Sequence, residues 1–111
     1  MTEDRKVFGD FLREMIKQTG ITQTAFYSSV GITKPYFYDI LSGKVNPPTP
    51  DLQYKMLGYL KISDQQRNEF LNLAANGRKE VPADIAQLIM GNPAKLDNIR
   101  EVLATMVASE G

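Results

Sequence analysis

Residues 22–43 read Thr-Gln-Thr-Ala-Phe-Tyr-Ser-Ser-Val-Gly-Ile-Thr-Lys-Pro-Tyr-Phe-Tyr-Asp-Ile-Leu-Ser-Gly, a pattern that predicts two short helices joined by a tight turn. Gly31 can adopt a left-handed backbone at little steric cost, which permits a sharp turn between the helices. Thr33 suits the N-cap of the second helix, and Pro35 suits its first turn, where a missing N–H costs nothing. Gly43 is typical of the residue that ends such a helix.

The two helices and their turn also match a known family pattern, position by position and in order. The matching residues are Thr22, Gln23, Ala25, Val30, Gly31, Ile32, Thr33, Ile40, Ser42, Gly43 and Lys44. On these residues the stretch resembles the Cro/repressor-type (Xre-like) helix-turn-helix DNA-binding family, and the resemblance extends over roughly residues 7–62. It implies an all-α, lambda-repressor-like domain of five helices. It also implies a sequence-specific transcriptional regulator that binds double-stranded DNA, with the helix starting near Thr33 in the major groove.

Outside this stretch, apolar spacing predicts further helices and no strands. One amphipathic helix begins at Val7, after a start over Met1–Lys6 that we expect to be frayed, and it ends at Gly20. Lys44–Pro50 should form an exposed, non-helical loop, because it holds three prolines. A fourth helix follows from Thr49 or Asp51, and a fifth runs from a Ser63 start signal to Asn76-Gly77.

The charged link after Gly77 suggests a boundary between a domain over residues 1–77 and a C-terminal helical segment over 78–111. That segment has two predicted helices, one with Pro82 in its first position and one from about Ala94, separated by Gly91-Asn92-Pro93. The apolar stripes of these helices must be buried somewhere. We expect a homodimer, because two-fold symmetric regulators read two half-sites. The alternative is that the helices fold back on their own domain.

The resemblance also indicates which residues would contact DNA. Base edges would be read from the second helix of the motif by Thr33, Lys34, Pro35, Tyr36, Tyr38 and Asp39. Phosphates would be bound by Thr22, Gln23 and Thr24 at the start of the first helix, and by Ser42 and Lys44 after the second. Gln23 matches the family's phosphate-binding glutamine.

The chain departs from the family pattern at several of these positions. Pro35 brings no hydrogen bond, and Asp39 repels phosphate unless it accepts a hydrogen bond from a base. Tyr36 and Tyr38 stand where the family often has polar side chains, and each can be packed rather than DNA-facing. Lys34 can equally be a solvated surface lysine, Gln23 a capping residue only, and Asp39 the partner of a nearby lysine. Phe37 is expected in the core.

Composition excludes several classes of function. The chain has 111 residues and no cysteine or histidine, so disulfides and the commonest zinc sites are absent, and we expect no metal and no cofactor. No catalytic motif is present, so we expect no enzyme. No apolar run approaches the roughly 20 residues that span a bilayer, and no signal peptide is evident, which predicts a cytoplasmic protein without membrane contact.

Net charge is zero, which alone does not favour nucleic acid. Residues 1–62 hold eight basic and six acidic side chains, so this part carries +2 and the remainder −2. Two rival functions therefore stay open. One is a protein–protein interaction module that kept the fold and lost DNA binding. The other is a ligand-sensing regulator with a cavity between the tail and the main domain, although no small-molecule effector is evident.

Overall fold

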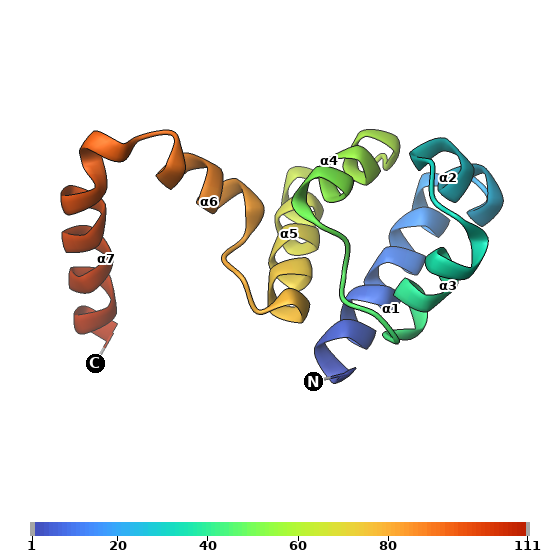
Figure 1. Ribbon diagram of the computed structural model, residues 1–111, viewed down its shortest axis with the longest axis horizontal. Coiled ribbons are helices and arrows are strands. Elements are labelled where there is room, and N and C mark those ends of the chain that lie inside the picture. The colour runs from blue at the N-terminus through green and yellow to red at the C-terminus, as the bar shows by residue number, and fades with distance from the viewer. Residues whose placement is uncertain (1, 111) are drawn as a thin grey trace.

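The computed structural model describes residues 2–110, and within them the chain is helical without a strand, which confirms the expected all-α class (Figure 1). In chain order the elements are α1 (Thr2–Thr19), α2 (Gln23–Val30), α3 (Lys34–Ser42), α4 (Pro50–Tyr59), α5 (Asp64–Arg78), α6 (Ala83–Met90), a short 3-10 turn η1 (Pro93–Lys95) and α7 (Leu96–Glu110).

The first five helices form a bundle around α1. This helix packs against α5 on one side and α3 on another, while α2 packs against α4. Phe8, Leu12 and Ile16 recur every four residues along α1 and are fully buried, so one stripe of the helix faces the core. Phe8 meets Phe70 of α5 edge-to-face, with ring centroids 5.1 Å apart.

Gly9 allows α1 and α3 to approach closely. A methyl group at Gly9 would lie 2.2 Å from the carbonyl oxygen of Leu41 and 2.7 Å from that of Ile40. Both are backbone atoms at the end of α3 and cannot move aside without shifting the helix. The absence of a side chain at Gly9 therefore allows the short separation between α1 and the end of α3.

Local signals around the α2–α3 turn are confirmed. Thr22 and Thr33 accept hydrogen bonds from the backbone N–H groups of Ala25 and Tyr36, at 3.0 and 3.3 Å. Gly31 and Gly43 both have φ of 79°, the left-handed conformation expected at helix ends.

Ser63 and Gln66 make the predicted start of α5 as a reciprocal capping box. Gly20 follows α1 with φ of 89°, as its role as a stop requires.

Other expectations about segment ends are wrong. Thr2–Lys6 belongs to α1, and this first turn is tied to the end of α5 by an ion pair between Asp4 and Lys79 of 2.9 Å. The predicted loop is non-helical from Lys44 to Thr49, but Pro50 already belongs to α4, and Pro47 and Pro48 are buried rather than exposed.

Gly77 does not end α5. The helix continues to Arg78, and Lys79 takes the left-handed conformation that closes it, with φ of 61°. Gly77 is instead buried against Pro47. A methyl group at Gly77 would lie 2.6 Å from the ring of Pro47, so the close contact requires glycine. The next two helices also begin one or two residues late: Pro82 precedes α6, and Ala94 lies in η1.

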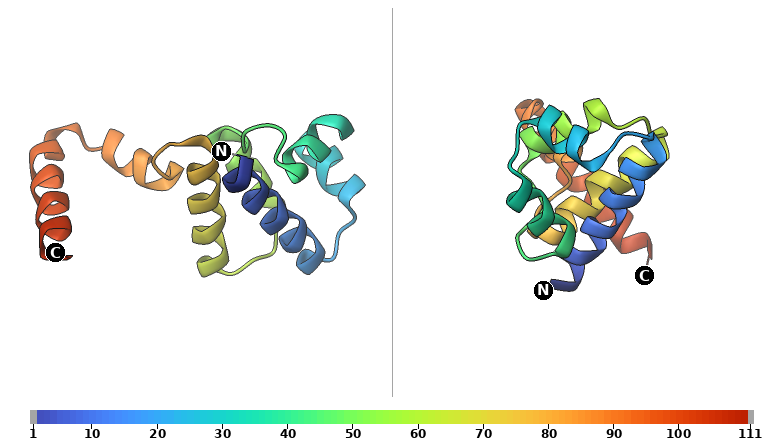
Figure 2. Two further views of the ribbon diagram at one scale, coloured as in Figure 1. Left: turned by 90° about the horizontal axis from the view of Figure 1, so that it is seen from below. Right: turned by 90° about the vertical axis from the view of Figure 1, so that its right-hand side faces the viewer.

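The remaining helices extend from the bundle as an arm, which we define as residues 83–110. In Figures 1 and 2 α6 leads away from α5, and α7 lies at the far end of the molecule, apart from α1–α5. The molecule is consequently elongated, with principal extents of 45 × 26 × 22 Å. None of the helices over residues 2–110 is both long enough and apolar enough to cross a lipid bilayer.

Candidate functional site

The outward face of α3 is the surface on which the predicted site depends. Phe37, Ile40 and Leu41 point into the core and are fully or almost fully buried. The opposite side of the helix is exposed and carries Lys34, Pro35, Tyr38 and Ser42.

Two predicted base-reading residues lie less far outward than expected. Asp39 is half-buried, and Tyr36 is half-buried because its ring packs against the core cluster. Part of the Tyr36 side chain therefore packs against the core, and only the rest of it is available to an external partner. None of the ion pairs among residues 2–110 includes Asp39, so the alternative that a lysine neutralises this carboxylate has no support.

The threonines that cap α2 and α3 keep a free donor. Thr22 and Thr33 use an oxygen lone pair to accept a backbone N–H, and a hydroxyl hydrogen remains to be donated. Both side chains are exposed, as is that of Thr24 in the first turn of α2. All three hydroxyls can therefore donate to an external acceptor.

One hydrogen bond connects α3 to the start of α2. The hydroxyl of Tyr38 donates to the side-chain oxygen of Gln23 across 3.0 Å. This bond occupies the amide oxygen of Gln23 and leaves its two amide N–H donors available. Gln23 also lies in the first turn of α2, where unpaired backbone N–H groups favour an anion. Sequence reasoning proposed both residues but not their contact, which links two helices.

Lysines lie at both ends of α3. Lys34 is exposed at the first helical position, and Lys44 is exposed just beyond the last. Sequence reasoning missed a third cation, Lys55 of α4, whose ammonium would lie 3.7 Å from a methyl group at Gly31. Nothing in the local sequence signals this proximity, because Lys55 comes from a different helix.

The far end of α3 is less suited to bind an anion. The hydroxyl of Ser42 already donates to the carbonyl oxygen of Asp39, at 3.2 Å. Ser42 also borders a shallow depression that it shares with Glu3, Lys6 and Asp10 of α1. Lys6 and Arg13 are already paired with Asp10, so both cations near the depression are engaged within the protein. We therefore separate Ser42 from the polar surface near Lys34 and Gln23.

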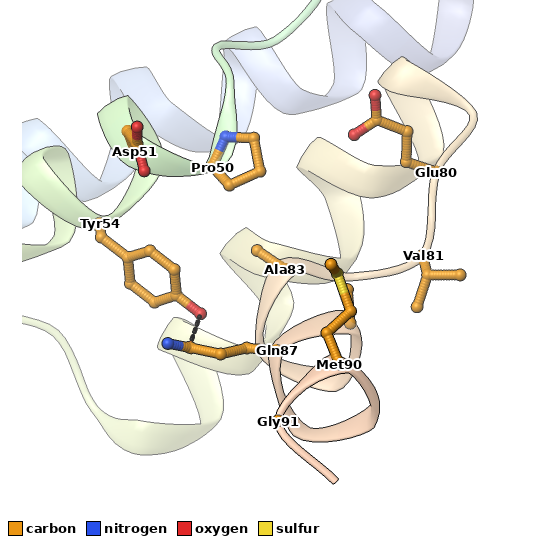
Figure 3. Close-up of a pocket in the computed structure, with 10 residues that line it drawn as sticks. Pro50, Asp51, Tyr54, Glu80, Val81, Ala83, Gln87, Met90 and Gly91 are labelled. Carbon is orange, nitrogen blue, oxygen red and sulfur yellow. Dashed lines mark hydrogen bonds between the residues drawn. The ribbon is translucent and has the colours of Figure 1, made fainter. Parts of the chain in front are cut away.

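An open groove of about 650 Å³ lies where the arm joins the bundle. Figure 3 shows Pro50 and Tyr54 of α4 facing Ala83 and Met90 of α6, and the hydroxyl of Tyr54 reaches Gln87 at 3.4 Å. Its walls are mainly apolar, with carboxylates only at the rim, so the groove suits an apolar or cationic occupant better than an anion.

Two carboxylates near the end of α5 are engaged by neighbouring cations. Among the described residues, no cluster of three or more carboxylate, histidine or cysteine side chains is placed to hold a metal ion. A hydrogen bond from Lys79 lowers the pKa of Asp4, and one from Arg78 lowers the pKa of Glu80. Both carboxylates lie away from the outward face of α3.

No protein-family model matches the chain, and comparisons with curated proteins and with solved structures likewise find no match.

Proposed function

We propose that this protein is a sequence-specific DNA-binding transcriptional regulator of the Xre type, which acts by binding and not by catalysis. In this proposal residues 1–77 are a lambda-repressor-like domain, and residues 78–111 are an appended segment. The observation that carries the proposal is that exposed side chains of α3 and the start of α2 are joined by a hydrogen bond between Tyr38 and Gln23. This hydrogen bond holds the two helices in register.

In a DNA complex, α3 would enter the major groove with Lys34 leading. A lysine ammonium there can donate to the acceptors of guanine, a contact worth about 1–3 kcal/mol of discrimination. Pro35 and Tyr38 would offer apolar contact, for which the methyl group of thymine is the matching feature.

Phosphate contacts would fall to the groups at the start of α2. Thr22 and Thr24 have exposed side chains with free hydroxyls, and half-buried Gln23 between them keeps two amide N–H donors. Lys55 would add positive charge near the turn between α2 and α3. These contacts would position the protein without reading the base sequence.

Selection from a random duplex library at a fixed, stated salt concentration tests the proposal. We expect one motif to be enriched. Lys34→Ala should change or relax the preference at one base pair, at a cost of about 1–3 kcal/mol. Arg67→Gln removes a positive charge from α5, which packs on a different side of α1 from α3, so it should leave the preference unchanged. A folded chain that enriches no sequence would contradict the proposal.

A protein–protein interaction module is the second candidate, and two observations favour it. The net charge is zero, and the centre of α3 presents Tyr38 with 41% of its surface exposed. Tyrosine is enriched in protein interfaces, whereas DNA-binding domains are often basic. A folded chain whose duplex binding is weak and independent of salt would favour this candidate, because release of counterions accompanies genuine phosphate contact.

A further inference from the structure

The arm carries most of the apolar surface that the described chain leaves uncovered. Eight of the twelve large apolar side chains that stay exposed among these residues belong to α6 and α7. They are Ile85, Leu88, Met90, Leu96, Val102, Leu103, Met106 and Val107. Contiguous exposed apolar surface of this kind marks an interaction site on a folded protein.

The arm also contains an open, mainly apolar groove between its two helices. Ile85 and Leu88 of α6 face Ile99 and Leu103 of α7 across an open space of about 320 Å³. The α1–α5 bundle does not fill it, because α7 lies apart from the bundle (Figure 2). Its only cation is Lys95 at one end, so the lining is overwhelmingly apolar.

The spacing within α7 indicates what fills the groove. Leu96, Ile99, Leu103 and Met106 are separated by three, four and three residues, which is the seam of a two-stranded helical pair. The same helix therefore supplies both one wall of a groove and a ridge able to enter one. A two-fold symmetric interface needs such self-complementarity, since the same patch must occur on both copies.

The size of the arm permits a second copy as the occupant. The arm has 8 residues in α6, 3 in η1 and 15 in α7, so a standard interface of roughly 20–30 residues on each side would use most of its exposed surface. The charged side chains of the arm are of both signs, two basic and four acidic, and Arg100 pairs with Asp97 on its own helix, so an identical copy meets a net charge of only −2.

We propose that the arm is a self-association element in which α7 of one copy lies in the α6–α7 groove of the other, reciprocally. This pairing leaves the outward face of α3 free on both copies, because α3 lies at the opposite end of the molecule (Figure 1). If the proposed function holds, the dimer would present two such faces to one duplex. The self-association itself does not depend on DNA.

The test is the solution mass of the full chain, measured without DNA over a range of concentrations. We expect a monomer–dimer equilibrium in the wild type. Leu103→Glu should weaken the dimer at least 100-fold, because it places a charge in the seam. Ala104→Glu is the matched control. Ala104 is the next residue on α7 and is exposed, but it lies off the apolar stripe, so this substitution should change the dissociation constant less than threefold.

Leu88→Glu provides a second variant, in case Leu103→Glu disturbs α7 itself. It alters the α6 wall of the groove without touching α7, and it should also produce monomer while the far-ultraviolet circular dichroism stays unchanged. A wild-type chain that remains monomeric up to about 1 mM would overturn the proposal. So would a dimer that survives both Leu103→Glu and Leu88→Glu. Because no outcome involves DNA, loss of the proposed function would leave this result standing.

Discussion

The bundle and the arm are both built from amphipathic helices, yet they use their apolar faces in opposite ways. Phe8, Phe37 and Phe70 of the bundle are completely buried, whereas Leu88 and Met106 of the arm are 67% and 59% exposed. The helical pattern in the sequence is equally clear in both regions. The difference teaches that an apolar stripe predicts burial without saying whether the same chain supplies the partner.

The same leucine truncation in each region should have very different effects on folding. Leu41→Ala in α3 should lower the free energy of unfolding by about 2–5 kcal/mol, since it leaves a cavity in a fully packed core. Leu88→Ala in α6 removes a side chain that is mostly in water, and it should change this quantity by less than about 0.5 kcal/mol.

Urea unfolding at a concentration where the chain is monomeric provides the measurement. Equal losses for Leu41→Ala and Leu88→Ala would mean that the arm packs onto the bundle in solution, and the contrast between the two regions would be lost.

A pair of glycines tests how tightly the bundle is packed. Gly9→Ala should destabilise the fold by about 1–3 kcal/mol, because the added methyl group meets backbone atoms of α3. Gly58 in α4 has open space around it, so Gly58→Ala should be neutral or stabilising by up to about 1 kcal/mol. Thermal unfolding of both variants decides the matter, and a stable Gly9→Ala protein would show that α1 and α3 are less closely packed.

Within the bundle, removal of one hydroxyl group tests whether the surface near α3 affects DNA binding independently of the stability of the core. Tyr38→Phe deletes the donor to Gln23 and should weaken DNA binding by about 1 kcal/mol, roughly fivefold. Stability should barely change, because the hydrogen bond that is lost lies at the exposed surface. Tyr59→Phe, on an equally exposed tyrosine of α4, is the control for binding titrations. If both variants bind alike, the contact does not position Gln23 for DNA.

The smallest effect concerns the ion pair at the end of the bundle, where the link to the arm begins. The hydrogen bond from Lys79 lowers the pKa of Asp4 below its usual 3.8, so ionised Asp4 stabilises the folded state above about pH 4. This contribution is lost as the pH falls through 3.8 and then through the lowered pKa.

Asp4→Asn should therefore reduce the melting temperature slightly at pH 7 and not at pH 2. Glu3→Gln, in the same helical turn, is the control for the interaction with the helix dipole. A loss of equal size for both variants at pH 7 would assign the effect to the dipole and not to Lys79.

The sequence by itself determined the all-helical class and most helix ends. Thr22, Thr33 and the Ser63–Gln66 box could be predicted because each cap bonds to backbone within three residues of itself. Gly31 and Gly43 could be predicted for a similar reason, since a left-handed backbone is a local requirement. These interactions need no knowledge of the rest of the chain.

Only the tertiary structure decided features that join distant segments. Gly77 reads as a helix stop but is a point of contact with Pro47, thirty residues away along the chain. Tyr38 and Gln23 form one polar surface only after α2 and α3 have turned back on each other. Likewise, only the positions of α6 and α7 relative to the bundle show that the chain itself leaves their apolar stripes exposed. Local pattern sets which face of a helix is apolar, while the packing of whole helices sets what that face meets.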